Sequence, residues 1–267
     1  MRKLATAMSG VLALAAVTAV ADAGPVATDA NGNFVVMDVD VSPPRSSHKR
    51  KARGVGVRIN LAAGNRRTGE RSPYNGEFSL RIHKGFKSNA GDFPACLLPR
   101  NQNEIGMERC PPEAKIGDGT AVADARPTLA DPIPVNLTAY NGEAREGNPT
   151  VIVIAKGSGS VPLNSEFDLE LKQEKTGPYG SVLVSLPPPP GTPQNLFSLS
   201  ELNLSIPDRE VTKRVNGKKV VVHLLEAPTK CNGIWRFLQT MKTPDGAAAI
   251  TAPDDEGCVK GAKPKKR

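Results

Sequence analysis

Short segments in which apolar and polar residues alternate run through most of this chain, separated by glycine, proline, asparagine and aspartate. Alternation with a period of two is typical of strands that bury one face. The 24 prolines and 25 glycines also interrupt the sequence too often for long helices, because proline lacks the backbone N–H that a helix interior requires. The sequence therefore predicts an all-β protein.

The clearest strand candidate is FVVMDVDV at 34–41, in which valine and methionine occupy one face and two aspartates the other. Eleven strands are predicted in all, at residues 34–41, 55–61, 78–83, 120–125, 133–140, 151–155, 166–172, 181–186, 197–206, 219–225 and 234–241. Asn216-Gly217 predicts a hairpin turn, since both residues tolerate positive φ. One short helix is expected near residues 101–107.

The regular spacing of these strands favours an antiparallel, jelly-roll-like β-sandwich with little helix. Aromatic residues make up only 4% of the chain, so its core must be mainly aliphatic. We expect residues 24–258 to form a single sandwich domain. The alternative is two smaller sandwiches divided near residues 126–132.

The first 23 residues have the three-part organisation of a secretory signal peptide. Arg2 and Lys3 provide the positive start, residues 4–20 are apolar, and the segment ends in Ala21-Asp22-Ala23. The expected product, cut after Ala23, is secreted and has no transmembrane segment. The alternative is an uncleaved N-terminal anchor.

Four cysteines follow this segment, and an even number in an exported chain favours disulfides. Three pairings are possible, of which the most local joins Cys96 to Cys110 and Cys231 to Cys258. Each such bond would stabilise the fold by roughly 3 kcal/mol, chiefly by restricting the unfolded chain. Zinc ligands at C-x-x-C or H-x-x-x-H spacing are absent.

The net charge of +8 is concentrated in two segments, and the rest of the mature chain has more acids than bases. Their residues are Arg45, Lys49, Arg50, Lys51 and Arg53 in one cluster, and Lys260, Lys263, Lys265, Lys266 and Arg267 in a basic tail, 259–267, expected to be disordered. Neither contains an aromatic residue for stacking on bases, so nucleic acid is not expected as a partner. Anionic cell-envelope polymers or lipid head groups suit an exported protein better. The alternative is that both segments are solubilising flanks.

The sequence predicts no catalytic residue, no metal and no cofactor. Asp38 and Asp40 share a strand face and could hold calcium or act in glycoside hydrolysis, but a solvent-facing strand surface opposite the apolar face is the favoured interpretation. Asp254, Asp255 and Glu256 are predicted to form an acidic turn before Cys258.

The leading functional hypothesis is a non-catalytic exported protein that binds or decorates the cell envelope. The rival is an envelope-active hydrolase whose site is assembled from distant residues. Its candidates are Asp38, Asp40, His83 and His223.

The segment FPACLLPRNQNEIGMERCPPEAKIGDG at 93–119 resembles a motif, F-P-x-C followed by C-P-x-x-A-x-I-G-x-G, of a family of exported actinobacterial proteins. The stretch PTKCNGIWRFLQTMKTPDG at 228–246 resembles the ending of the same family, and the resemblance extends over roughly residues 55–258. The matching motif positions are Phe93, Pro94, Cys96, Cys110, Pro111, Ala114, Ile116, Gly117 and Gly119. The resemblance implies a β-rich secreted protein and assigns no catalytic residue.

Two features of these stretches also have direct physical interpretations. Gly117 and Gly119 would let the chain turn sharply into the next strand. Trp235, the single tryptophan, is expected to pack in the core or at a sheet edge, with carbohydrate stacking as the alternative.

Overall fold

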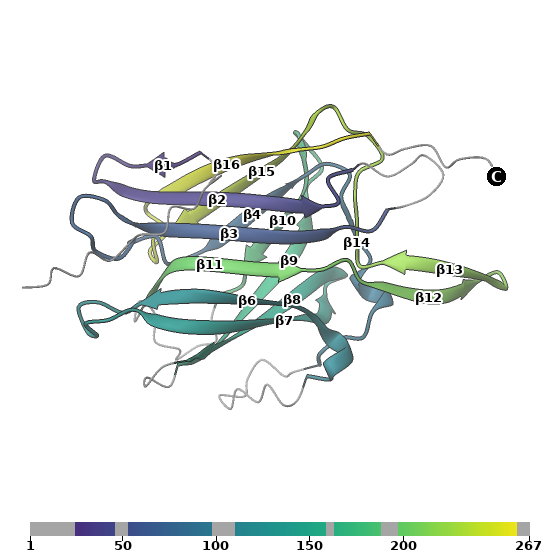
Figure 1. The fold of residues 1–267 in the computed structure, drawn as a ribbon, viewed down its shortest axis with the longest axis horizontal. Coiled ribbons are helices and arrows are strands. Elements are labelled where there is room, and N and C mark those ends of the chain that lie inside the picture. Colours follow the sequence, from purple (N-terminus) through teal and green to yellow (C-terminus); the bar gives the residue numbers. More distant parts are fainter. Residues whose placement is uncertain (1–24, 46–52, 98–109, 159–162, 188–196, 261–267) are drawn as a thin grey trace, which may run out of the picture.

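The computed structural model describes residues 25–45, 53–97, 110–158, 163–187 and 197–260 (Figure 1). The regular secondary structure of these residues is almost entirely strand, which confirms the all-β class. The strands are β1 (Ala27–Thr28), β2 (Asn33–Ser42), β3 (Gly56–Asn65), β4 (Phe78–His83), β5 (Lys87–Ser88), β6 (Lys115–Asp124), β7 (Ile133–Arg145), β8 (Asn148–Gly157), β9 (Asn164–Gln173), β10 (Tyr179–Ser185), β11 (Ser198–Ile206), β12 (Glu210–Val215), β13 (Lys218–His223), β14 (Leu225–Glu226), β15 (Ile234–Lys242) and β16 (Ala249–Gly257). Two short 3-10 helices are also described, η1 (Ala90–Asp92) and η3 (Pro112–Ala114).

All eleven predicted strands are present, with ends that differ from prediction by a few residues. The strands that the alternation pattern missed are β1, β5, β12, β14 and β16. The predicted hairpin turn is confirmed, since Asn216 and Gly217 have φ of 50° and 77°. The expected helix at 101–107 and the signal peptide at 1–23 lie outside the described residues.

Twelve strands form one continuous antiparallel sheet, in the order β1-β2-β3-β11-β6-β7-β8-β9-β10-β4-β15-β16. The predicted sandwich would divide the strands between two stacked sheets, whereas here a single sheet rolls until its two ends face each other (Figure 1). Strands of about ten residues carry the right-handed twist that allows such rolling. Residues 126–132 are the connection between β6 and β7, which pair with each other.

The two ends of the sheet meet along a seam between β2 and β16, where carboxylates replace the backbone ladder. The backbone N–H of Val39 donates to Asp254 Oδ2 at 3.0 Å, and that of Val41 donates to Glu256 Oε1 at 3.3 Å. The stretch at 254–256 is therefore part of β16, and its prediction as a turn was wrong. Its acids serve as hydrogen-bond acceptors for the edge of β2, which would otherwise present unpaired amides.

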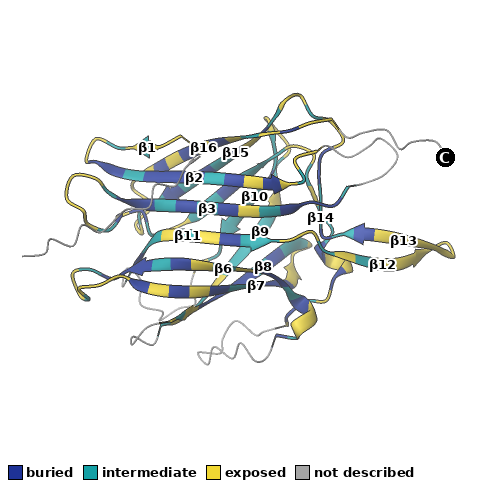
Figure 2. Ribbon diagram, viewed as in Figure 1, coloured by how far each residue is buried: buried dark blue, intermediate teal, exposed yellow. Residues whose placement is uncertain are grey.

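Buried residues alternate with more exposed ones along many of the strands (Figure 2), and the buried apolar side chains cluster into the core. On β2, for example, Val35, Met37 and Val39 are at most 1% exposed. Trp235 is fully buried and meets the ring of Phe86 edge-on, with centroids 5.1 Å apart. A buried indole offers no free face to a sugar, so its role is core packing.

The two disulfides adopt the most local of the three possible pairings, Cys96–Cys110 and Cys231–Cys258. The described residues include no free cysteine. The first bond lies beside β7, where Cys96 forms an isolated bridge with Gly142. The second fixes the end of β16 to the segment before β15.

Gly117 and Gly119 lie inside β6, so the expectation that they make a sharp turn was wrong. A Cβ at either position would collide with the backbone of β11, at Ser205 and Asn203 respectively. These glycines are required by the close approach of two neighbouring strands.

Candidate functional site

The two basic segments leave the folded body close to each other. Arg45, at the start of the first, forms a parallel bridge with Val259, whose N–H donates to Pro44 O at 2.8 Å. Lys260 follows directly and is exposed, as is Arg45. The chain therefore enters the basic cluster beside the point where it enters the basic tail (Figure 1).

The basic cluster ends beside a hairpin made by β12 and β13. The N–H of Ala227 donates to Arg53 O at 3.0 Å, and Gly54 bridges Glu226. A Cβ on Gly54 would collide with the side chains of His223 and Asp208, which lie at the root of the hairpin.

This hairpin carries four basic residues close to its turn, Lys213, Arg214, Lys218 and Lys219. Lys213 Nζ binds Asp92 at 2.6 and 2.7 Å, which ties the hairpin to η1. His223 Nδ1 lies 3.0 Å from Asp208 Oδ1 and holds the root. The other three cations, Arg214, Lys218 and Lys219, lie nearest the turn.

The structure thus gathers Arg45, Arg53, Lys260 and the hairpin at one end of the molecule, which we call the basic end. The hairpin bases were missed as a site by sequence reasoning, although their clustering around Asn216-Gly217 was a usable signal. The other predicted polyanion-binding residues lie outside the described residues: Lys49, Arg50, Lys51, Lys263, Lys265, Lys266 and Arg267.

The two acids proposed for a hydrolase lie on the outward side of β2. Asn60 Nδ2 donates to Asp38 Oδ2 at 2.8 Å, and Asp40 lies 3.9 Å from Arg58 Nη1. Both aspartates therefore have partners on the neighbouring strand β3, as the solvent-facing alternative expects.

The two histidines proposed for the same hydrolase lie elsewhere. His83, on β4, accepts a hydrogen bond at Nδ1 from the N–H of Arg236 at 3.2 Å. Burial, and secondarily the charge of Arg236, lower the pKa of His83 below its ordinary value. Among the described residues neither histidine contacts Asp38 or Asp40, so the structure does not bring the four candidates together.

The structure does bring Asp38 and Asp40 of β2 close to Asp254 and Glu256 of β16, which are far from them in the sequence. Burial is the main cause that raises the pKa of Asp254 and of Glu256, and the nearby charges of Asp38 and Asp40 raise them further. The hydrogen bonds from β2 oppose this effect. No group of three or more His, Cys, Asp or Glu side chains suited to a metal occurs in the described ranges.

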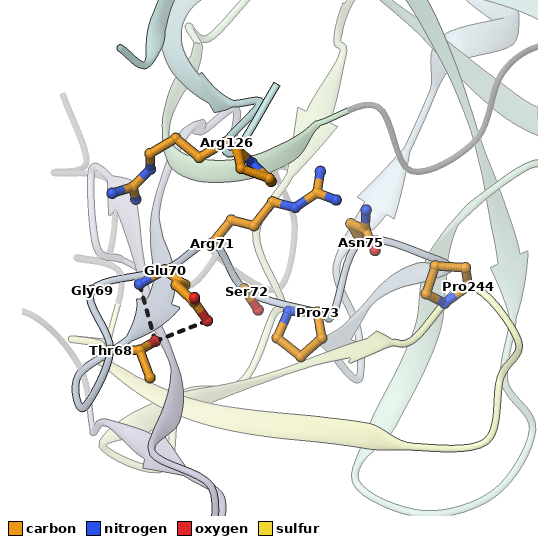
Figure 3. Close-up of a pocket in the computed structure, with 10 residues that line it drawn as sticks. Thr68, Gly69, Glu70, Arg71, Ser72, Pro73, Asn75, Arg126 and Pro244 are labelled. Atoms are coloured by element: carbon orange, nitrogen blue, oxygen red, sulfur yellow. Dashed lines mark hydrogen bonds between the residues drawn. The ribbon is translucent and has the colours of Figure 1, made fainter. Parts of the chain in front are cut away.

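At the far end of β3 from the hairpin, the surface has an open depression of about 570 Å³ (Figure 3). Its lining residues are Thr68, Gly69, Glu70, Arg71, Ser72, Pro73, Asn75, Arg126, Pro127 and Pro244. Arg126 binds the buried Asp124 through Nε, at 2.9 and 3.1 Å, and through Nη2, at 2.5 Å. This guanidinium therefore has a structural role in holding the β6–β7 connection.

No family model, curated protein or solved structure matches the chain. The family resemblance noted from the sequence stays a prediction. In the described part of the chain, no helix has the length and apolar character of a membrane span.

Proposed function

We propose that this is an exported, non-catalytic protein that binds anionic material of the cell envelope through its basic end. The observation that carries the proposal is the contact of the hairpin root with Gly54, combined with the bridge between Arg45 and Val259. Through these contacts, cationic segments that are far apart in the sequence leave the body at one place. Cations collected at one end create a stronger local potential than the same cations spread over the surface.

Two further features support export and binding. Both disulfides are formed, which fits an oxidising compartment, and the N-terminal pattern fits a signal peptide. At the basic end, Asp92 and Asp208 already have cationic or imidazole partners, so they neutralise little of the charge near the turn. The rival hydrolase has less support, because Asp38 and Asp40 on β2 contact neither His83 nor His223 in the described residues.

The test is retention of the mature, oxidised protein on a sulfated-polysaccharide resin and on purified cell-wall material, with elution by a salt gradient. We expect K218E/K219E and R45E/K260E each to elute at lower salt than the wild type. Each variant replaces two cations by anions, and salt screens the weaker attraction that remains between exposed groups. The matched control is R67E/K156E, which reverses two exposed bases at the opposite end of the sheet. Elution at the same salt for all three variants, or no retention of the wild type, would overturn the proposal.

A further inference from the structure

The β12–β13 hairpin projects from the rolled sheet and exposes nearly its whole surface (Figure 2). Seven large apolar side chains are exposed in the described ranges, and three of them are valines of this hairpin. Val215, Val220 and Val221 are 43%, 38% and 48% exposed. A two-stranded ribbon normally needs another sheet or helix to cover such residues.

The register of the hairpin places these valines directly beside cations. Val215 pairs with Lys218, and Val220 pairs with Lys213. On the opposite face of the hairpin, Val221 belongs to the cross-strand pair adjacent to the Arg214–Lys219 pair. Each face of the outer hairpin therefore combines apolar and positively charged side chains.

The base of the hairpin is fixed, so its turn is held away from the body. Val222 is buried in a core cluster that also contains Phe93 and Leu224, and Val211 packs against the same cluster. Together with the Lys213–Asp92 ion pair, these contacts limit how far the hairpin can fold back onto the sheet.

We propose that this hairpin docks on the surface of an anionic lipid bilayer, an inference that rests on the proposed function and names its partner. Cations alone would accept any polyanion. Binding to a hydrated polymer would bury little of the exposed valine surface, so the valines would add little to the affinity. The interfacial region of a bilayer, in contrast, accommodates apolar side chains between the head groups. Each cation near an anionic membrane strengthens binding by roughly fivefold, and Arg214, Lys218 and Lys219 lie together at the turn.

The test is co-sedimentation of the mature, oxidised protein with vesicles of phosphatidylglycerol and phosphatidylcholine, and with pure phosphatidylcholine. We expect binding to the anionic vesicles only. K218E/K219E should lose most of this binding. V215S/V221S should weaken it by about tenfold, because the lost apolar burial is independent of charge, yet should keep wild-type elution from the sulfated-polysaccharide resin.

The matched control for the valines is V26S, since Val26 is 43% exposed outside the hairpin. If V215S/V221S binds anionic vesicles as well as V26S does, the inference is wrong. If the wild type is retained on the resin but ignores vesicles, the lipid inference fails and the proposed function stands. Failure to bind either material overturns both.

Discussion

The backbone N–H of Val39 and the carboxylate of Asp254, 215 residues apart in the sequence, are joined by a 3.0 Å hydrogen bond across the seam. Together with the Val41–Glu256 bond, this contact closes the rolled sheet without a backbone ladder. The seam therefore depends on side chains in a way that the rest of the sheet does not.

Removing the Asp254 carboxylate should weaken the seam. In Asp254→Ala the N–H of Val39 loses its acceptor, and an unpaired buried amide costs about 1–3 kcal/mol. We expect a fall of that size in the free energy of unfolding, measured by denaturant titration. Asp255→Ala removes the exposed neighbour and should change it by less than about 0.5 kcal/mol. Equal effects of the two substitutions would contradict the role of Asp254.

The seam also predicts a pH dependence. Because burial raises the pKa values of Asp254 and Glu256 in the folded protein, the unfolded chain releases these protons at lower pH. Stability from this pair is therefore greatest at pH below the ordinary carboxyl range, and it falls as pH rises through the raised pKa values. The double variant D254N/E256Q should show a shallower fall in stability as pH rises above about 4, measured by thermal unfolding. A slope unchanged from wild type would rule out the seam as its source.

The second disulfide should stabilise both the fold and the seam, since Cys258 follows β16 directly. C231S/C258S should lower the free energy of unfolding by about 3–4 kcal/mol, and C96S/C110S by about 3 kcal/mol. Hydrogen exchange of the backbone amides should distinguish the two variants. The amides of Val39 and Val41 should exchange faster in C231S/C258S but not in C96S/C110S. Equal exchange in both variants would show that the seam does not need this bond.

Gly119→Ala tests the approach of β6 to β11. The added methyl group collides with backbone at Asn203, which cannot rotate away as a side chain could, so we expect a loss of about 2 kcal/mol. Gly91→Ala is the control, because a Cβ there meets nothing within 4 Å. If both variants have the same melting temperature, the strands are not as close as described.

Arg126→Gln should leave the carboxylate of Asp124, which is 1% exposed, without its ionic partner. The Arg126 side chain is 41% exposed, so water partly replaces it, and we expect the free energy of unfolding to fall by about 1–3 kcal/mol. Hydrogen bonding to Arg126 lowers the pKa of Asp124, so this stability is present above the ordinary value of 3.8 and is lost as pH falls through the lowered one. The free energy of unfolding of the variant should therefore fall less than that of the wild type when the solution is made strongly acidic. Arg236→Gln, at the exposed 3.9 Å pair with Asp255, should behave like wild type.

The sequence by itself determined eleven of the sixteen strands and one of the turns that join them. Side-chain alternation is a local property, so it located β2, β4 and nine other strands, and Asn216-Gly217 specified its hairpin. It missed β12, whose residues are mostly polar, and β16, where Pro253 and three acids have the composition of a turn. β12 is almost wholly exposed, whereas β16 does alternate between buried and exposed positions, but one of its buried positions is Asp254, so apolar and polar residues do not alternate along it.

Only the tertiary structure decided which strands are neighbours, and with them the seam and the basic end. Alternation gives each strand two faces but does not specify its partner, because antiparallel pairing can join segments at any separation. The acids of β16 make sense as acceptors only once β2 lies beside them. Likewise, Arg45, Lys260 and the hairpin form one surface because the rolled sheet brings their strand ends to the same side.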